Sequence, residues 1–233
     1  MISSDIIYTE SLNKFGVVIC QRIIDLLSKT IQKHNKCSMA VSGGSTPLPV
    51  YKKIIGRQYS DALDWSKVHL FFIDERCVPE NDEENNFNTC YNAWLKHYPE
   101  IKYNRIEGWH NPRKTALKYE KDIKSILDIR NGIPQFDLIF MGMGEDGHIA
   151  SLFPENLFEN KTSRCVENIY VKSKEMDRIT MTIPILNNAK NRIIGILGEK
   201  KRQIFKDLSN SDYKNYPIAK LLSSDANDTW VLY

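Results

Sequence analysis

The residues best suited to chemistry lie in one glycine-rich segment, residues 141–154. It begins Met-Gly-Met-Gly-Glu-Asp-Gly-His, so Asp146 and His148 stand two residues apart among three glycines. An imidazole beside a carboxylate can exchange protons near neutral pH. Gly142, Gly144 and Gly147 leave the backbone free to bend and to approach a ligand closely. The segment therefore predicts a site of proton transfer.

Two further polar segments carry groups that bind anions. Residues 42–46 read Ser-Gly-Gly-Ser-Thr and offer N–H groups and hydroxyls at a strand-to-helix turn, which suits a phosphate. Thr46 is expected to cap that helix, with Pro47 in its first turn. No Gly-Lys-Ser/Thr follows, so this is not a Walker A loop. Arg76, in the Asp-Glu-Arg of residues 74–76, can bind phosphate or carboxylate through its guanidinium fork.

Each of these three segments follows an apolar run that predicts a buried strand. The runs cover residues 37–41, 68–73 and 136–141. The carboxyl ends of parallel strands share one edge of a sheet, and ligands bind there, in the crevice where the strand order reverses. We therefore expect the three segments to face one pocket.

The rest of the chain alternates between helix and strand patterns. Apolar residues at helical spacing predict a helix over residues 10–34. Further helices are expected over 87–97, 113–130 and 201–208, a loop over 80–86, and strands over 169–171, 179–183, 193–197 and 230–232. This alternation predicts an α/β fold. We expect a single-domain three-layer sandwich over residues 1–233, with a mostly parallel, Rossmann-like sheet and helices on both faces.

The composition excludes several other classes of protein. The 233 residues carry a formal net charge of only +3, and scattered Lys and Arg do not indicate a nucleic-acid partner. No apolar stretch is long enough to span a membrane and no secretory signal is visible, so a cytoplasmic location is expected. The five cysteines show no metal-binding spacing, which predicts reduced thiols and no metal. Structural or surface roles are expected for His34, His69, His97, His110 and Ser151.

Taken together, these segments resemble the glucosamine-6-phosphate isomerase/6-phosphogluconolactonase family. Gly-Glu-Asp-Gly-His-Ile-Ala-Ser-Leu-Phe-Pro at residues 144–154 and Asp-Glu-Arg at 74–76 are similar to its lactonase branch. The deaminase branch typically has Asp-Glu-Tyr, and Phe-Asn-Glu-Pro after His-Ile-Ala. Arg-Ile-Thr at 178–180 and Gly-Glu-Lys-Lys at 198–201 extend the resemblance from about residue 40 to the C-terminus.

The resemblance implies hydrolysis of 6-phospho-D-glucono-1,5-lactone to 6-phosphogluconate, without cofactor or metal. His148 would be the general base that activates water, and Asp146 would orient it. Gly142 and Gly144 would place backbone N–H groups near the developing oxyanion. Arg76 would address phosphate, the sugar or the product carboxylate. The residues implied for phosphate binding are Gly43, Gly44, Ser45, Thr46, Arg178 and Lys201. A monomer is favoured, although the sequence leaves the oligomeric state open.

Two alternatives remain at this point. A deaminase/isomerase of the same fold would use Asp74 as its base, and Arg76 and the Ser-Leu-Phe-Pro of residues 151–154 argue against it. A sugar-phosphate sensor would bind without turnover. Such a sensor would be expected to lose the Asp146–His148 pair, which this chain keeps.

Overall fold

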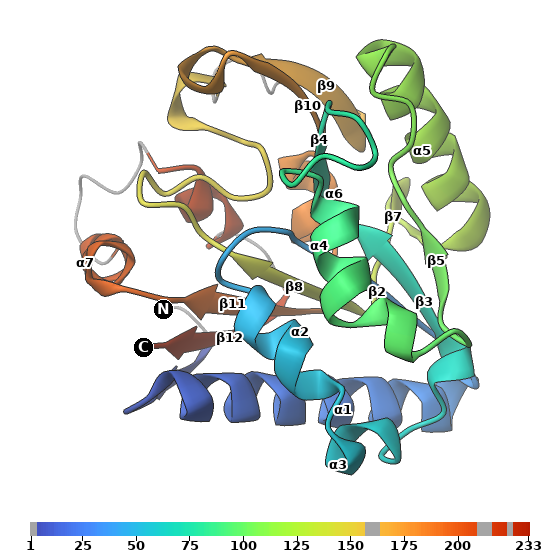
Figure 1. Ribbon diagram of the computed structural model, residues 1–233, viewed down its shortest axis with the longest axis vertical. Coiled ribbons are helices and arrows are strands. Elements are labelled where there is room, and N and C mark those ends of the chain that lie inside the picture. The colour runs from blue at the N-terminus through green and yellow to red at the C-terminus, as the bar shows by residue number, and fades with distance from the viewer. Residues whose placement is uncertain (1–3, 157–163, 209–215, 223–225) are drawn as a thin grey trace.

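A seven-stranded parallel sheet forms the centre of the protein (Figure 1). The structure, a computed structural model, describes residues 4–156, 164–208, 216–222 and 226–233. In spatial order the strands are β1 (Ser4–Tyr8), β12 (Asn227–Leu232), β11 (Asn191–Ile196), β8 (Leu138–Gly142), β2 (Cys37–Val41), β3 (Val68–Phe72) and β5 (Lys102–Asn104). Every neighbouring pair runs parallel, as expected.

The strand order reverses between β2 and β8. From β2 the chain moves outward to β3 and β5, whereas from β8 it moves the other way to β11 and β12. The two strands pair directly, with Met39 opposite Leu138 and Val41 opposite Phe140. The segments that follow β2 and β8 therefore emerge side by side at the carboxyl edge, where α/β sheets bind ligands.

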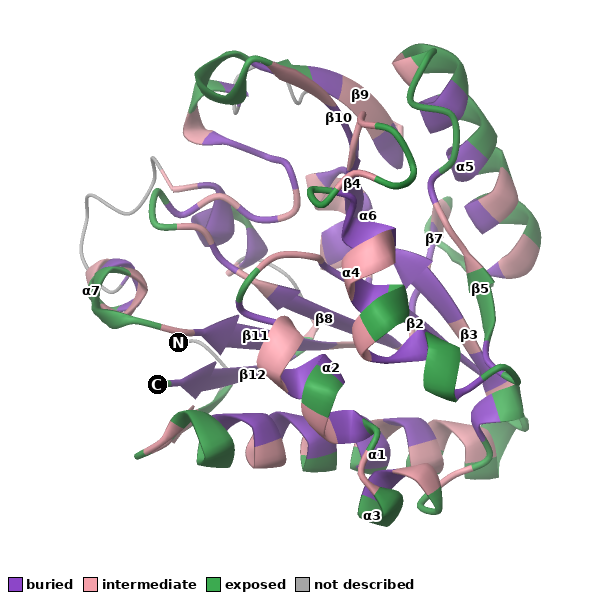
Figure 2. Ribbon diagram, viewed as in Figure 1, coloured by how far each residue is buried: buried purple, intermediate pink, exposed green. Residues whose placement is uncertain are grey.

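Helices flank this sheet, and the longest, α1 (Leu12–His34), runs along one face. It begins at Ser11, whose Oγ accepts a hydrogen bond from the N–H of Lys14 at 3.1 Å. The buried part of its ribbon is turned towards the strands, and the exposed part is turned away from them (Figure 2). The other helices are α2 (Leu48–Ile54), α3 (Arg57–Ser60), α4 (Asn86–Ala93), α5 (Pro112–Ile126), α6 (Ile183–Asn187) and α7 (Glu199–Asp207). None of the helices in the described ranges is both long and apolar enough to cross a membrane.

Short 3₁₀ helices connect several of these elements. They cover Trp65–Lys67, Leu95–His97, Pro154–Asn156, Lys172–Lys174 and Pro217–Leu221.

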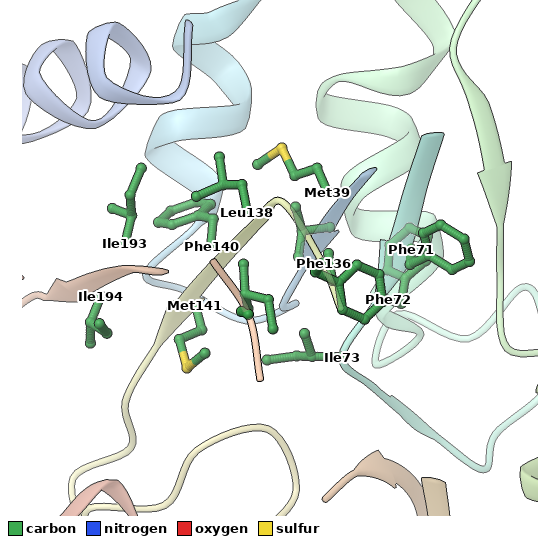
Figure 3. Close-up of a cluster of buried hydrophobic side chains, with 14 of the residues drawn as sticks. Met39, Phe71, Phe72, Ile73, Phe136, Leu138, Phe140, Met141, Ile193 and Ile194 are labelled. Carbon is green, nitrogen blue, oxygen red and sulfur yellow. The ribbon is translucent and has the colours of Figure 1, made fainter. Parts of the chain in front are cut away.

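The core lies on both faces of the central strands, as Figure 3 shows for the side chains around β8. Every residue of β2 is buried, and so are the first four of β8. Such near-continuous apolar runs are typical of parallel strands covered on both sides. Aromatic rings also pack in this core. Phe71 of β3 contacts Phe136 edge to face, with ring centroids 5.3 Å apart.

A second, antiparallel sheet stands beside the first and corrects three predictions. It contains β4 (Asp74–Arg76), β10 (Met176–Met181) and β9 (Val166–Val171). The strands expected over 169–171 and 179–183 lie here rather than in the parallel sheet, and Asp-Glu-Arg, expected as a polar segment that follows a strand, forms a strand of its own. The second of these strands ends early, because Ile183 begins α6 with Pro184 in its first turn.

The helix expected over residues 113–130 is wrong at its end. Helix α5 stops at Ile126, and β6 (Ile129–Arg130) pairs with β7 (Ile133–Pro134) as a hairpin. Its turn residues Asn131 and Gly132 both have positive φ, 54° and 78°. Asn-Gly is a strong signal for this tight turn, and it outweighs the helical spacing that precedes it.

The remaining differences concern short elements. The helix expected over 87–97 ends at Ala93 and continues as the 3₁₀ turn Leu95–His97. The edge strands β1 and β5 were not predicted, because each is short and leaves side chains exposed. Ile6, Tyr8 and Tyr103 are 45%, 68% and 42% exposed.

Candidate active site

The three predicted segments meet in one cavity of about 240 Å³ at the carboxyl edge of the main sheet. The predicted site residues that line it are Gly43, Gly44, Ser45, Thr46, Arg76, Gly142, Gly144, His148, Arg178 and Lys201. Asp146 is not in the wall and reaches the cavity through His148. The prediction of one shared pocket is therefore confirmed.

Asp146 holds the imidazole of His148 by its Nδ1 atom. Its Oδ1 lies 2.6 Å from Nδ1 and also accepts the backbone N–H of His148 at 3.1 Å. Since the carboxylate accepts, Nδ1 carries the hydrogen of a neutral ring and the lone pair is on Nε2. Nε2 has no hydrogen-bond partner among the described residues. Burial raises the pKa of Asp146, but the hydrogen bonds and charge of His148 outweigh it and lower that pKa overall.

The loop that carries this pair is closed by its own backbone. The N–H of Gly144 donates to the carbonyl of His148 at 2.9 Å, and Gly147 has a φ of 76° that favours glycine. The N–H of Gly142 donates to Oγ of Ser42 at 3.3 Å. Both N–H groups proposed for an oxyanion are thus already used. The role predicted for them towards an oxyanion stays a prediction.

Residues 43–46 instead offer unused donors to the cavity. Their four backbone N–H groups donate to no protein acceptor within the described ranges. Gly44 has a φ of 85°, and a Cβ on Gly43 would lie only 1.8 Å from Oδ1 of Asn86. The backbone of the turn therefore favours glycine at position 44, and the close approach of Asn86 favours it at position 43. Free N–H groups beside a helix start suit an anion.

Lys201 adds a positive charge to this turn. Its Nζ donates to Oγ1 of Thr46 at 3.1 Å. Burial lowers the pKa of Lys201, while Glu145 and Asp146 oppose that shift. Thr46 does not cap α2 as expected. The cap residue is Pro47, with no side-chain bond to the helix, and the Thr46 hydroxyl serves Lys201 instead.

Two arginines lie opposite each other in the small sheet, where Arg178 of β10 pairs with Arg76 of β4. Neither guanidinium forms an ion pair with a carboxylate in the part of the chain that the structure describes. Nη1 of Arg76 donates to the carbonyl of Glu84 at 2.5 Å. Burial lowers the pKa of Arg178, an effect that the charge of Asp74 opposes. Adjacent cations without carboxylate partners favour binding of an anion.

Two polar residues that line the cavity were not predicted for it from the sequence. Asn86 was given no role in the site, and Asp74 was considered only as the base of the alternative deaminase. Asn86, expected at the end of a loop, is 1% exposed and donates through Nδ2 to the carbonyl of Asp74 at 3.1 Å. Asp74 is 5% exposed and accepts the hydroxyl of Ser151 at 2.7 Å. Ser151 is fully buried, as its expected structural role requires. No local pattern marks Asn86, because its partners precede it by eleven or more residues.

A larger cavity, about 490 Å³, lies at the opposite edge of the sheet, at the amino ends of the strands. None of the predicted site residues line it, whereas His34 and His69 do. Nε2 of His69 lies 2.7 Å from Oδ1 of Asn104, which is a structural contact. We place the chemistry in the smaller cavity, because it lies at the carboxyl edge of the parallel strands and joins the Asp146–His148 pair to the unused N–H groups of residues 43–46.

All five cysteines are free thiols, as predicted. Four of them are buried, and Cys77 is partly buried. Burial raises the pKa of Cys20 and Cys37 to about 12, so neither is a nucleophile near neutral pH.

The chain is similar to known proteins over most of its length. The family model "Glucosamine-6-phosphate isomerases/6-phosphogluconolactonase" matches residues 12–230. The chain is 29% identical over 233 residues to a 6-phosphogluconolactonase of Haemophilus influenzae, covering 95% of this chain and 97% of that one. It is 31% identical over 213 residues to a 6-phosphogluconolactonase of Synechocystis, with coverages of 88% and 85%.

The fold agrees as well. A crystal structure of 6-phosphogluconolactonase from Thermotoga maritima superposes with a TM-score of 0.84 at 25% identity, covering 98% of this chain and 99% of that one. With the family model matched over most of its length, the chain belongs to the glucosamine-6-phosphate isomerase/6-phosphogluconolactonase family.

Proposed function

We propose that this protein hydrolyses 6-phospho-D-glucono-1,5-lactone to 6-phosphogluconate. The observation that carries the proposal is the shared cavity, in which the His148–Asp146 pair faces unpaired N–H groups and cations. The relatives named 6-phosphogluconolactonase support the same reaction. We further propose that residues 1–233 act as one domain, as a monomer in the cytoplasm, without cofactor or metal.

His148 acts as the general base in this proposal. Nε2 takes a proton from water while the water oxygen bonds to the lactone carbonyl carbon. Asp146 stabilises the imidazolium that forms. When the bond between that carbon and the ring oxygen breaks, the imidazolium can return the proton to the leaving oxygen. The product is a free hydroxyl and a carboxylic acid, which ionises at neutral pH to the carboxylate and releases its proton to solvent.

The phosphate is held at the other end of the substrate. The N–H groups of residues 43–46, with Lys201 and Arg178, supply hydrogen bonds and positive charge to it. Its binding energy would position the lactone against His148. Arg76 lies beside Arg178 and would address the sugar or the product carboxylate.

The proposal is tested by following acid release from freshly prepared lactone, with spontaneous hydrolysis subtracted. His148→Ala should lower turnover by roughly 10²–10⁴-fold, because it removes the base. Binding of 6-phosphogluconate, measured by calorimetry, should persist in that variant. Wild-type turnover in His148→Ala would remove the imidazole from the mechanism.

Two further measurements, ligand binding and ammonia release, separate the alternatives. Wild-type protein that binds 6-phosphogluconate without speeding hydrolysis would be a sensor. Release of ammonia from glucosamine 6-phosphate would instead indicate a deaminase that uses Asp74. We expect no such release, because one oxygen of Asp74 already accepts the hydroxyl of Ser151.

A further inference from the structure

One buried aromatic ring contacts two of the proposed functional side chains. Phe153 stacks on the imidazole of His148, with ring centroids 4.1 Å apart and planes at 27°. Cζ of Arg178 lies 5.6 Å from the centroid of the same ring. The ring therefore lies against both the proposed base and a proposed phosphate-binding cation.

The surrounding structure fixes this ring in place. Phe153 is 2% exposed and packs with Ile169 and Val171 in a small apolar cluster separate from the main core. Both partners belong to β9, and Ile169 is paired with Arg178 of β10. The same small sheet thus supports the ring and carries the arginine.

The stacking supplies a constraint on His148 that Asp146 does not. A single bond from Nδ1 to a carboxylate oxygen leaves the imidazole free to turn about the line of that bond. An aromatic face at stacking distance fixes the plane of the ring. With both contacts present, the direction of the Nε2 lone pair is set.

For Arg178, the ring is a partner that does not compete with substrate. A guanidinium is attracted to an aromatic face without giving up its N–H donors. A carboxylate in the same place would neutralise the charge and occupy those donors. Contact with Phe153 therefore orients Arg178 and leaves it available for an anion.

We propose that Phe153 is a positioning residue that sets the direction of His148 Nε2 and its distance from Arg178. It would thereby match the spacing between base and phosphate-binding cation to one substrate, with the lactone carbonyl at one end and the phosphate at the other. The inference rests on the proposed lactone hydrolysis.

The test compares Phe153→Leu, which keeps an apolar side chain but removes the ring, with Phe153→Tyr, which keeps the ring. Phe153→Leu should lower kcat by roughly ten- to a hundred-fold and raise KM, because misplaced groups lose much of their effect. Phe153→Tyr should restore most of both. The matched control is Val166→Ala, a buried change on β9 in the main core, which should lower thermal stability and leave kcat and KM unchanged.

A second readout does not depend on turnover. The ring current of Phe153 should shift the NMR signal of the Cε1 proton of His148, assigned by its loss in His148→Ala. That shift should disappear in Phe153→Leu and remain in Phe153→Tyr.

An unchanged signal or unchanged kinetics in Phe153→Leu would overturn the inference, as would an equal loss of kcat in Val166→Ala. Absence of lactone hydrolysis by the wild-type protein would contradict the proposed function instead. The His148 signal would then still decide whether Phe153 holds the imidazole.

Discussion

At the scale of single residues, the Asp146–His148 pair fits its loop only because residue 144 is glycine. A Cβ at Gly144 would lie 2.1 Å from Nδ1 of His148 and 2.7 Å from Oδ1 of Asp146. The φ of Gly144 is not positive, so alanine is compatible with the backbone there. A methyl group at this position would therefore displace the imidazole rather than strain the backbone.

Gly144→Ala should therefore lower turnover by roughly a hundred-fold while changing the melting temperature little. Lactone hydrolysis and thermal unfolding measure the two effects. The matched control is Gly132→Ala, at the tip of the β6–β7 hairpin, where a Cβ meets nothing but φ is 78°. That variant should lose some stability and keep full turnover. Normal turnover in Gly144→Ala would show that the imidazole can work from a displaced position.

At the same scale, the sequence predicted the residues of local motifs and missed those that depend on distant partners. Asp146 and His148 stand two positions apart, so their pairing was readable from spacing. Phe153 and Arg178 are twenty-five positions apart, and only the pairing of β9 with β10 brings them together. For Gly142 and Gly144, the sequence did not show that both N–H groups have acceptors in the folded chain, His148 for one and the distant Ser42 for the other.

At the scale of elements, a buried ion pair joins the neighbouring strands β11 and β12 of the main sheet. Arg192 of β11 donates through Nε and Nη2 to the two oxygens of Asp228 of β12, at 2.7 and 2.9 Å. The side chains are 0% and 5% exposed. Removal of one partner leaves the other charge buried without full compensation, which is strongly destabilising.

Asp228→Ala should thus lower the free energy of unfolding by roughly 3–5 kcal/mol, measured by urea denaturation. Asp61→Ala is the control, because the Arg57–Asp61 pair is 95% and 69% exposed and should contribute nothing measurable. Equal effects of the two substitutions would show that burial does not govern the strength of these pairs.

The elements that the sequence predicted best are the long or fully buried ones. Strands β2, β3 and β8 and helix α1 were predicted within about two residues, since each has many apolar positions in one pattern. The small antiparallel sheet was not predicted, because β4 has three residues and its pairing with β10 spans about a hundred positions. In the sequence, its strands therefore resembled a polar segment after a strand or members of the main sheet.

At the scale of the whole molecule, the cavity lies where the two sheets meet. The main sheet supplies the loops with His148 and residues 43–46, and the small sheet supplies Arg76 and Arg178. Glu75, between the cavity residues of β4, links this strand to the start of α4. It accepts the N–H groups of Asn86 and Phe87 at 2.7 and 2.9 Å and is 3% exposed.

The titration of Glu75 should make the stability of the fold depend on pH. Burial raises the pKa of Glu75 to about 7, against the effect of its backbone hydrogen bonds. This folded-state pKa lies above the unfolded-state value of about 4.3. Glu75 therefore makes its full contribution to the free energy of unfolding below about pH 4.3. The contribution is lost as pH rises through 7.

Glu75→Gln removes this titration while keeping a polar side chain of similar size. The free energy of unfolding of the wild type, relative to Glu75→Gln, should decrease between about pH 4.3 and 7 and level off above it. Urea denaturation of both proteins across that range measures the difference. Subtraction removes the contribution to the free energy of unfolding from every other group that titrates in both proteins. A difference that stays constant or grows with pH would mean that the N–H donors of Arg76, Asn86 and Phe87 keep the carboxylate ionised in spite of its burial.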